Sequence, residues 1–322
     1  MEQIAPANHV LGECKVPSVN LSENGNHEGG RPRVSVIIPV YNDFQRLEVC
    51  LDALARQTYP SASTEVLVVD NGSEENWTAP KGRFSLDLKV LQEPKKGSYA
   101  ARNLGLSSAT GEILAFTDSD CIPDTNWLQA GVAALAAQRK ASMIGGCVRN
   151  ALLNPSNPGL AELYDSVVAF PQEYYVEKVH FAVTANLFAH RELFDVVGPF
   201  DANLESGGDT EWGIRAHRLS FPQGYARDAV VSHPVRGSFG EIFRKQKRIA
   251  AGQFDKAGLG EVSILRFLGH LLWDLRPPLI RFAKIWRGKP VQSPLHKVMF
   301  TAIAYYLRFI NIITKARLRI HR

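Results

Sequence analysis

The sequence lacks several features that define common classes of protein. Its four cysteines (Cys14, Cys50, Cys121 and Cys147) are scattered and form no CxxC pair, which argues against a disulfide framework and against a zinc site. No uncharged apolar run reaches the roughly 18 residues of a membrane-spanning helix. The N-terminus lacks a basic stretch followed by an apolar core, so we expect no secretory signal and a cytoplasmic protein.

Charge is not spread evenly along the chain. The formal net charge is +5, yet from Arg236 onward lysine and arginine heavily outnumber aspartate and glutamate. Such a skew is typical of a protein that meets an acidic partner, either an anionic lipid surface or a nucleic acid. A solvated basic face without a partner is an equal alternative at this point.

The chain has 322 residues, of which 45% are apolar, and is long enough for one large domain or two modest ones. Residues 1–32 are rich in polar residues, Gly and Pro and show no apolar periodicity, so we expect a disordered tail there. From Val34 onward, continuous β-branched runs alternate with segments of helical periodicity, and Asn42-Asp43 offers a helix N-cap. This alternation predicts an α/β fold with a mostly parallel sheet covered by helices on both faces.

The apolar runs give the expected positions of the elements. In the first half, strands are predicted at 34–39, 65–70, 88–91 and 113–117, with a helix at 98–107. The second half predicts strands at 181–189 and 230–233 and helices at 191–197 and 209–219. Beyond Gly237 the sequence becomes apolar and basic and predicts helices at 239–254, 262–286 and 294–319.

Polar residues follow three of the predicted strands. The segments are Tyr41-Asn42-Asp43, Asp70-Asn71-Gly72-Ser73 and Asp118-Ser119-Asp120. A single acidic strand end is common as a helix cap or turn former. In a parallel sheet, however, ligands bind outside the carboxyl ends of the strands, so three such ends at one edge predict a polar ligand with hydroxyl and phosphate groups.

Asp118-Ser119-Asp120 carries the most specific signal. Two carboxylates two residues apart, directly after a buried strand, can reach the same side of a turn. Hard oxygen ligands suit Mg²⁺ or Mn²⁺, which also bind the phosphate oxygens of a substrate. The chain has neither a GxxxxGK[ST] nor a GxGxxG loop, so phosphate groups would depend mainly on this divalent cation.

Four segments stand in a specific order: 34–42 (VSVIIPVYN), 68–73 (VVDNGS), 97–105 (GSYAARNLG) and 116–120 (FTDSD). Together they resemble the family 2 glycosyltransferases of the GT-A fold over about residues 33–235. The resemblance implies an inverting sugar transfer from a UDP-, GDP- or TDP-sugar, with UDP favoured. It also implies a catalytic domain at 33–236, with a donor half at about 33–120 and an acceptor half at about 121–236, followed by basic amphipathic helices at 237–322.

The resemblance implies roles at the nucleoside end of the donor. Pro39, Tyr41 and Asp43 match the segment that borders the nucleoside, and Asp70 matches the carboxylate that hydrogen-bonds the base. A carboxylate can accept from a base N–H, but this interaction selects a pyrimidine over other bases only weakly.

Further roles are implied nearer the sugar and the diphosphate. Gly97, Arg102 and Asn103 match the segment beside the nucleotide, and Asp118-Ser119-Asp120 matches the family's DxD, whose last carboxylate usually ligates the metal. Arg236 is placed to meet the diphosphate. A divalent cation bridging diphosphate oxygens would act as a Lewis acid, and nearby arginines would add electrostatic stabilisation as the leaving group gains charge.

An inverting transfer also needs a base for the acceptor hydroxyl. The segment 205–212 resembles the family's Glu-Asp motif, with Asp209 at the base position and Gly208 where an acidic residue is often found. This departure leaves Glu211 as a rival base. The alternative is that Asp209 only caps the following helix and that Glu211 lies exposed on it.

Three further residues match positions with a role in relatives. His233 resembles a third metal ligand found in some of them, although a histidine beside a proline is more often a structural loop residue. Asn186 and Trp212 resemble acceptor-side positions. For Trp212, stacking on a sugar face and packing in the core are both open.

The C-terminal helices combine basic residues with Phe, Leu and Trp. A basic amphipathic helix of this kind suits the surface of an anionic bilayer. Helices that merely pack on the catalytic domain are the alternative. Because lipid-linked acceptors are frequent in the family that the chain resembles, peripheral contact with the cytoplasmic face of a membrane is favoured. Nucleic-acid binding has no supporting motif.

Two other functions compete with this interpretation. A nucleotidyltransferase that makes nucleotide sugars would have a glycine-rich, basic loop directly after the first strand, where this chain has residues 39–43 (PVYND). A non-catalytic relative that only binds nucleotide sugars would have lost its base. Intact Asp118, Asp120 and Asp209 argue against it.

Overall fold

The computed structural model describes residues 31–75, 77–78, 82–138, 142–287 and 293–321. The chain divides into residues 1–31 and a second unit, Pro32–Arg322, which holds the helices and strands given below. The disordered tail expected at 1–32 falls, for residues 1–30, outside the described residues.

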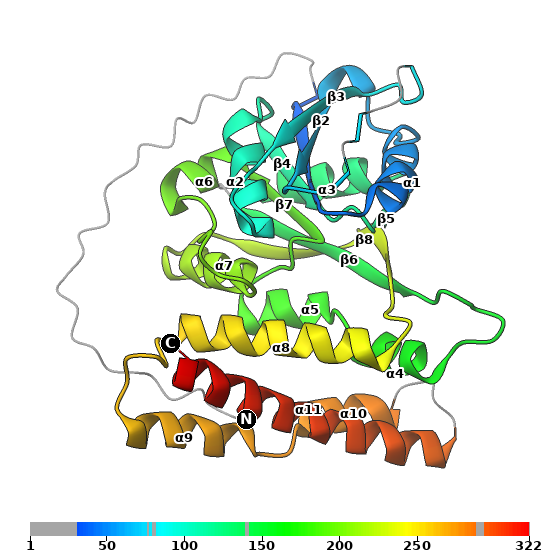
Figure 1. The fold of residues 1–322 in the computed structure, drawn as a ribbon. Coiled ribbons are helices and arrows are strands. Elements are labelled where there is room, and N and C mark those ends of the chain that lie inside the picture. Colours follow the sequence, from blue (N-terminus) through cyan, green and yellow to red (C-terminus); the bar gives the residue numbers. More distant parts are fainter. Residues whose placement is uncertain (1–30, 76, 79–81, 139–141, 288–292, 322) are drawn as a thin grey trace. The chain divides into compact units, whose positions relative to one another are not determined.

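A mixed sheet forms the centre of the second unit (Figure 1), and its strands lie in the order β3-β2-β1-β4-β7-β6-β8-β5. β1 to β4 pair in parallel, as do β6 and β8, whereas β7 runs antiparallel to both of its neighbours and β5 runs antiparallel to β8. The strands are β1 (Val34–Val40), β2 (Thr64–Asp70), β3 (Asp87–Gln92), β4 (Ile113–Thr117), β5 (Ile122–Pro123), β6 (Met143–Ala151), β7 (Asn186–His190) and β8 (Gln223–Pro234).

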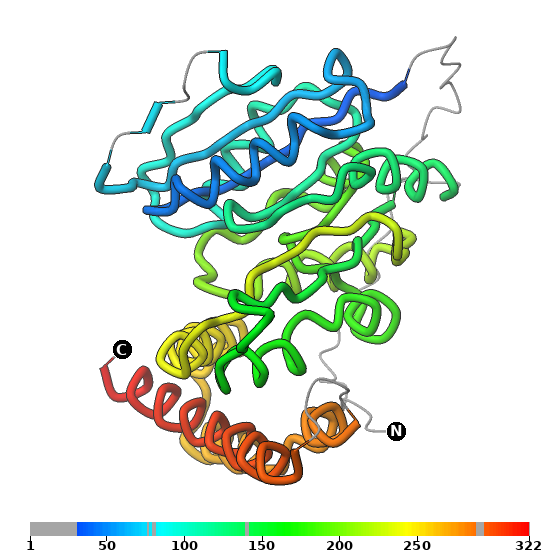
Figure 2. Tube along the Cα trace, turned by 90° about the vertical axis from the view of Figure 1, so that its right-hand side faces the viewer, coloured from blue at the N-terminus to red at the C-terminus, as the bar shows by residue number. Residues whose placement is uncertain are grey.

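Helices cover both faces of this sheet (Figures 1 and 2). α1 and α3 pack on one face and α2, α6 and α7 on the other, each through an apolar cluster. The α/β fold predicted from the alternating pattern is therefore confirmed. The elements are α1 (Phe44–Leu54), η1 (Ser61–Ser63), α2 (Ser98–Ser108), α3 (Trp127–Ala136), α4 (Leu160–Val168), α5 (Gln172–Tyr174), η2 (Tyr175–Val179), α6 (Arg191–Val197) and α7 (Gly208–Arg218).

Among the described residues, four helices follow β8, and α8 lies between the sheet and α11 (Figure 2). They are α8 (Phe239–Lys256), α9 (Ile264–Asp274), α10 (Leu279–Arg287) and α11 (Pro294–His321). The prediction of a single helix at 262–286 is wrong, because Pro277 and Pro278 separate α9 from α10. Proline lacks the amide hydrogen that a helix interior needs and clashes with the preceding turn.

The strands of the second half also differ from the prediction, and β8 is longer than the expected 230–233. The strand expected at 181–189 begins only at Asn186, because the side chain of Gln172 binds the backbone of Val183 and Asn186 in place of a neighbouring strand. β6 was not predicted. Its Gly145 and Gly146 hide the β pattern, yet a Cβ at Gly146 would lie 2.4 Å from the Asn186 side chain, so this close approach requires glycine.

Candidate functional site

The carboxyl ends of β1, β2 and β4 meet at one edge of the sheet. The register aligns Val40 with Asp70, and it aligns the first residues of β1 with those of β4. Tyr41, Asp70 and Asp118 therefore leave the sheet at the same edge, as predicted for ligand-binding residues of a parallel sheet.

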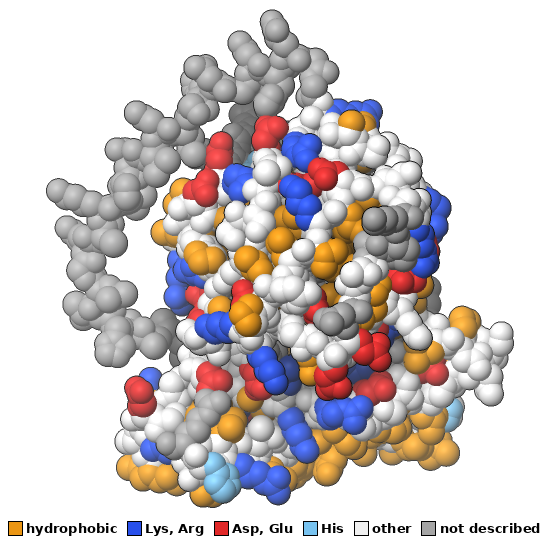
Figure 3. Space-filling view, turned by 45° about the horizontal axis from the view of Figure 1, so that its top comes forward, with side chains coloured by type: hydrophobic (Ala, Val, Ile, Leu, Met, Phe, Trp, Pro, Cys, Tyr) orange, Lys and Arg blue, Asp and Glu red, His pale blue; other side chains and the backbone are white. Residues whose placement is uncertain are grey.

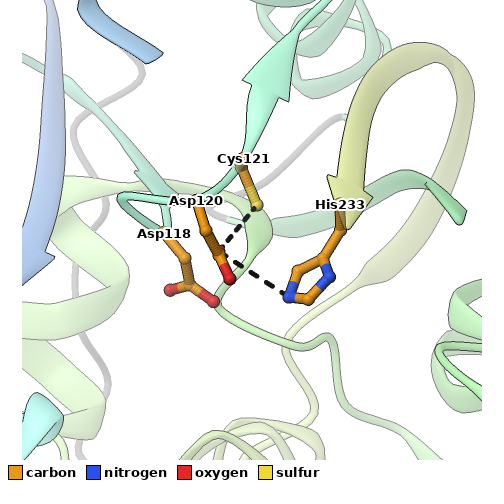
Figure 4. Close-up of side chains that lie close together, drawn as sticks. All are labelled: Asp118, Asp120, Cys121 and His233. Atoms are coloured by element: carbon orange, nitrogen blue, oxygen red, sulfur yellow. Dashed lines mark hydrogen bonds and ion pairs between the residues drawn. The ribbon is translucent and has the colours of Figure 1, made fainter. Parts of the chain in front are cut away.

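Four side chains gather where β4 and β8 end (Figure 4). One donor atom each from Asp118, Asp120, Cys121 and His233 lies within 4.8 Å of the others. Burial raises the pKa of the Cys121 thiol well above its usual range, which disfavours a thiolate, and its Sγ lies 3.9 Å from the carbonyl oxygen of Ala185. Two carboxylates and one imidazole therefore remain as a donor set, and such a set suits a divalent cation that prefers oxygen and nitrogen ligands.

The orientation of His233 fits this donor set. Its Nδ1 lies 2.8 Å from the carbonyl oxygen of Pro234. Because a carbonyl only accepts, Nδ1 carries a hydrogen, and Nε2 faces Asp120 Oδ1 at 3.7 Å. The ring also packs on Phe170, with centroids 4.7 Å apart. A histidine held through Nδ1 in this way is typical of metal ligands.

The electrostatics of Asp120 also fit a cation. Burial raises the pKa of this carboxyl, attraction to His233 opposes the rise, and repulsion from Asp118 adds to it. A positive ion between the two carboxylates would remove this repulsion. The residues present therefore fit a divalent cation on their chemistry.

Arg46 is a residue of the site that the sequence analysis missed. Its Nε donates to Asp43 Oδ1 at 2.9 Å, and its Nη1 lies 3.8 Å from Asp120 Oδ2. Arg46 thus brings together Asp43, after β1, and Asp120, after β4. The signal available in the sequence was the three-residue spacing from Asp43 to Arg46, which places both on one side of a first helical turn.

A polar network joins the loops after β1, β2 and β3. Asp70 Oδ1 accepts from the backbone and the hydroxyl of Ser73, at 3.0 and 2.6 Å, and that hydroxyl also accepts from the Asn42 amide. Asn71 Oδ1 accepts from the amide of Gly97 at 2.7 Å. Gly97 has a φ of 124°, which favours glycine at the start of α2.

Arg102 and Tyr99, both on α2, connect the acidic cluster to Asp209. Arg102 Nη2 donates to Asp118 Oδ1, and its guanidinium lies 5.6 Å from the centre of the Tyr99 ring. The Tyr99 hydroxyl donates to Asp209 Oδ1 at 3.3 Å. Arg102 Nε is buried and has no hydrogen-bond partner within the described part of the chain.

Gly208 and Asp209 lie in the first turn of α7. A Cβ on Gly208 would come within 2.8 Å of the Tyr99 ring, which explains glycine at this position. Burial raises the pKa of the partly exposed Asp209 carboxyl, against hydrogen bonds from Thr210 and Tyr99. Glu211, by contrast, binds the Arg215 guanidinium through both carboxylate oxygens at 2.9 Å.

Three sequence-predicted site residues lie in structural positions instead. Asn103 uses both ends of its amide on the backbone of Phe200, at 2.8 and 3.0 Å. Asn186 is fully buried and binds Trp127 and two backbone carbonyls. Trp212 is fully buried and stacks on Phe194, so no face of its indole is open to a sugar. The acceptor roles of Asn186 and Trp212 and the nucleotide role of Asn103 do not fit this structure.

The remaining predicted residues lie at or near the same edge. Pro39 pairs with Val69 inside the sheet, Tyr41 is 52% exposed beyond β1, and Ser119 is 9% exposed between the two aspartates. Arg236 follows β8, and its Nη1 binds Asp165 of α4 at 3.0 Å.

Comparison with known proteins identifies the family of this chain. The model of the family described as Glycosyl transferase family 2 matches residues 35–197. The glycosyltransferase AglE of Haloferax volcanii is 39% identical over 248 residues, which is 76% of this chain and 80% of AglE. The chain belongs to glycosyl transferase family 2. It is therefore a transferase enzyme, as the four sequence segments predict.

Other relatives are more distant. The validoxylamine A glucosyltransferase of Streptomyces hygroscopicus subsp. jinggangensis is 29% identical over 62% of this chain, which spans about half of that relative (54%). A mannosyltransferase of Pyrobaculum calidifontis, solved with GDP-Man and Mn²⁺, matches with a TM-score of 0.58 at 21% identity, over 91% of this chain and 88% of that one. TarS 1–349 of S. aureus with UDP-GlcNAc matches at 0.51 and 18%, over 89% and 90%. These structures support the GT-A fold.

Proposed function

We propose that this glycosyltransferase moves a sugar, with inversion, from a nucleotide sugar to a hydroxyl group of a glycan or a lipid-linked acceptor. The observation that carries the proposal is one connected site. The donor set of Asp118, Asp120 and His233 is joined to Asp209 through Arg102 and Tyr99. The same sheet edge therefore holds residues that can act on the leaving group and a residue that can act on the attacking hydroxyl.

Asp118, Asp120 and His233 would hold a divalent cation, Mn²⁺ or Mg²⁺. When bound, such an ion supplies Lewis acidity to the diphosphate oxygens as the bond to the sugar breaks. Mn²⁺ and GDP-Man in the Pyrobaculum calidifontis structure support the choice of cofactor and donor class. Arg46 and Arg102 each hold one of the two carboxylates in place.

The loop network after β1 and β2 would bind the nucleoside. Asp70 uses Oδ1 within the chain and makes no hydrogen bond through Oδ2 to the described residues, which leaves this oxygen for a base N–H. The exposed ring of Tyr41 lies at the same edge. Arg236 would add positive charge toward the diphosphate. We favour a UDP-sugar as the donor, and UDP-GlcNAc in TarS supports that class.

Asp209 is the base in this proposal. Burial raises its pKa, which makes the ionised carboxylate a stronger base than an exposed aspartate. Tyr99 orients the carboxylate through its hydroxyl. Asp209 takes the proton of the acceptor hydroxyl while that oxygen bonds to the anomeric carbon and the nucleoside diphosphate leaves. Glu211 is paired with Arg215 and is the weaker candidate.

The test combines donor binding with turnover. We expect UDP-sugars to raise the melting temperature in the presence of Mn²⁺ or Mg²⁺, and not with EDTA. Asp209→Asn should keep this stabilisation but lose about 10²–10⁴-fold in the release of nucleoside diphosphate. Glu211→Gln, on the same helical turn, should keep most of the turnover.

Three outcomes would contradict the proposal. If no nucleotide sugar stabilises the protein in the presence of metal, the proposed donor site is wrong. If Asp209→Asn keeps full turnover, Asp209 is not the base. Stabilisation without any turnover in the wild type, across several acceptors, would indicate a protein that only binds nucleotide sugars.

A further inference from the structure

Apolar side chains cover the outer side of α9, α10 and α11. On α9, Leu265 is 78% exposed and Leu272 is 66% exposed, and with Ile264 and Leu268 they follow the spacing of one helical face. Exposed apolar side chains also lie at the start of α10 (Leu279 and Ile280), near its end (Trp286) and in a row along α11. Single exposed apolar residues are ordinary, but a contiguous set on three neighbouring helices marks an interaction surface.

α11 shows most clearly that this exposure is organised. One side of the helix, with Phe300, Ala304 and Leu307, packs into the protein. A second apolar row runs along the outward side at intervals of three or four residues: Leu295, Val298, Ala302, Tyr306, Phe309 and Ile313. A helix that only packs on a soluble domain has one apolar face and one polar face. The second apolar row therefore requires a second apolar environment.

The charge of this surface has one sign. Asp274 is the only carboxylate among residues 263–321, and it is buried in an ion pair with Lys315 at 2.7 Å. Arg266, Arg287 and Arg317 are exposed on these helices, and Arg276 is exposed in the segment between α9 and α10. In Figure 3, apolar side chains gather along the lower border of the molecule, where these helices lie in Figure 1, with lysine and arginine directly above them.

Both exposed tryptophans of this surface have a cation beside the ring. The Arg276 guanidinium lies 3.7 Å from the Trp273 ring centre, and Lys297 Nζ lies 5.9 Å from that of Trp286. An apolar hollow of about 440 Å³ opens between α10 and α11, lined by Phe282, Trp286, Val298, Ala302 and Tyr305 among others. Tryptophan paired with cationic groups is typical of the level at which lipid headgroups meet acyl chains.

We propose that the outer side of α9, α10 and α11 is a docking face with which the chain lies on the surface of an anionic lipid bilayer. Its Leu, Ile, Val and Phe side chains enter the outermost part of the acyl region, and its Arg and Lys side chains contact anionic headgroups. The hollow between α10 and α11 receives part of one acyl chain. Among the described residues, no helix has the length and apolar character to cross a bilayer.

Charge distinguishes this occupant from the alternatives. A two-fold contact between two copies of the face would bring the same cationic groups together without carboxylates to neutralise them. A nucleic acid would meet the arginines but would leave the apolar rows exposed to water. An anionic bilayer matches both the apolar rows and the cations.

The docking face is connected to the candidate active site through α8. The inner side of α11 packs on α8. In turn, Lys245 of α8 lies 4.5 Å from the Phe170 ring that packs on His233, and Gly252 of α8 leaves no room for a Cβ beside Ser206, three residues before the proposed base. Docking would hold the site at a fixed height above the bilayer. That consequence, unlike docking itself, rests on the proposed function and favours acceptors carried by membrane lipids.

Vesicle binding tests the docking face without any donor or acceptor. The full chain is mixed with vesicles of phosphatidylcholine, with or without phosphatidylglycerol, and sedimented. We expect binding to the anionic vesicles, a weaker response to neutral ones, and a blue shift of tryptophan fluorescence on binding. The double variant Leu265→Glu/Leu272→Glu should bind about tenfold more weakly or worse, because it places charge in the apolar region.

Val196→Glu/Leu219→Glu is the matched control, since both residues are exposed apolar side chains on or beside α6 and α7 (41% and 45%). It should bind vesicles like the wild type. Both double variants should keep the wild-type melting temperature and its increase with nucleotide sugar, which separates docking from the donor site.

The proposal is overturned if the wild type fails to sediment with anionic vesicles, or if the two double variants bind equally. It is also overturned if light scattering shows a dimer in solution that Leu265→Glu/Leu272→Glu dissociates while vesicle binding is absent. Binding to RNA with no binding to vesicles would overturn it in favour of a nucleic-acid surface.

Discussion

The central sheet and the layer of α9, α10 and α11 place their apolar side chains in opposite ways. β1 and β2 are buried along nearly their whole length, and the polar groups stand at one edge, where the strands end. The outer helices bury one side and leave a second apolar side exposed. The sheet thus buries its apolar side chains within the protein. The helical layer leaves a row of apolar side chains exposed to water unless a second apolar surface covers them.

The two regions also differ in the sign of their charge. Carboxylates gather at the sheet edge, where Asp118 and Asp120 repel one another without a cation. The helical layer carries arginine and lysine, and its one carboxylate is neutralised internally. This distribution of charge matches the two proposals, a divalent cation at the sheet edge and an anionic lipid surface at the helical layer.

The largest effect on turnover is expected at the sheet edge, where the carboxylates gather. Asp120→Asn removes one charge from the donor set, so turnover should fall about 10²-fold or more and the metal dependence of donor binding should be lost. Asp124→Asn is the matched control, because the half-exposed side chain of Asp124 pairs, among the described residues, with Arg149 alone. Isothermal titration with Mn²⁺ distinguishes them. Equal Mn²⁺ affinity in both variants would count against the metal site.

The largest effect on stability is expected at the carboxylate inside the helical layer. Asp274→Asn leaves the buried Lys315 ammonium without its partner and should cost about 3–5 kcal/mol of the stability of α9 and α11. Urea unfolding followed by hydrogen exchange should show early opening of these helices while the sheet stays protected. The double variant Asp274→Leu/Lys315→Met should recover most of the loss. If the single variant is as stable as the wild type, the pair does not hold the layer together.

A smaller effect is expected from a buried carboxylate of the sheet. Burial opposes ionisation of Glu65, but hydrogen bonds from Ser35, Thr110 and Lys89 outweigh it and lower its pKa to about 2. Because the folded pKa lies below the unfolded value of 4.5, this stabilisation is present above pH 4.5 and is lost as the pH falls toward 2. Because solvent screens the charge of the half-exposed Lys89, we expect this stabilisation to be about 2–3 kcal/mol.

Glu65→Gln measures that contribution. Urea midpoints of the wild type and the variant should differ most near pH 6 and should converge toward pH 2. A difference that is constant over this range would mean that packing, rather than the charge, is responsible.

The smallest effect is expected at Tyr99. Tyr99→Phe removes the hydroxyl that donates to Asp209, a loss of about 1 kcal/mol for the ionised carboxylate. The pKa of Asp209 should rise further, so the acid limb of kcat/KM should move to higher pH while the rate at high pH changes little. Tyr306→Phe, at an exposed tyrosine of α11, is the control and should leave the acid limb in place. An unshifted acid limb in Tyr99→Phe would show that Tyr99 does not position the base.

The elements with the strongest local patterns were predictable. The β-branched runs at 34–39 and 65–70 became β1 and β2, since strands buried on both faces need continuous apolar residues. The carboxylates at 118 and 120 could be expected to share one site, because they follow a strand of that sheet directly. The position of β6 could not be predicted in this way. Its two glycines lie in a strand because Val176 and Asn186, which are far away in the sequence, leave no room for a Cβ there.

The site residues divide in the same way. Asn103 and Trp212 match family positions in the sequence, yet an amide or an indole binds whichever partner the fold brings near, here Phe200 and Phe194. Arg46 offered only its three-residue spacing from Asp43, and that spacing does not show its contact with Asp120. The contacts of Arg46 with Asp120 and of Tyr99 with Asp209 join segments that are distant in the chain.

The sequence by itself determined the alternation of strands and helices, the acidic strand ends and the basic C-terminal region, because periodicity and charge are properties of neighbouring residues. Only the tertiary structure decided that His233 turns its Nε2 toward Asp120, that Tyr99 joins Arg102 to Asp209, and that α11 keeps one apolar row outside. Those contacts depend on how segments far apart in the chain pack, and the packing of the whole fold sets that geometry.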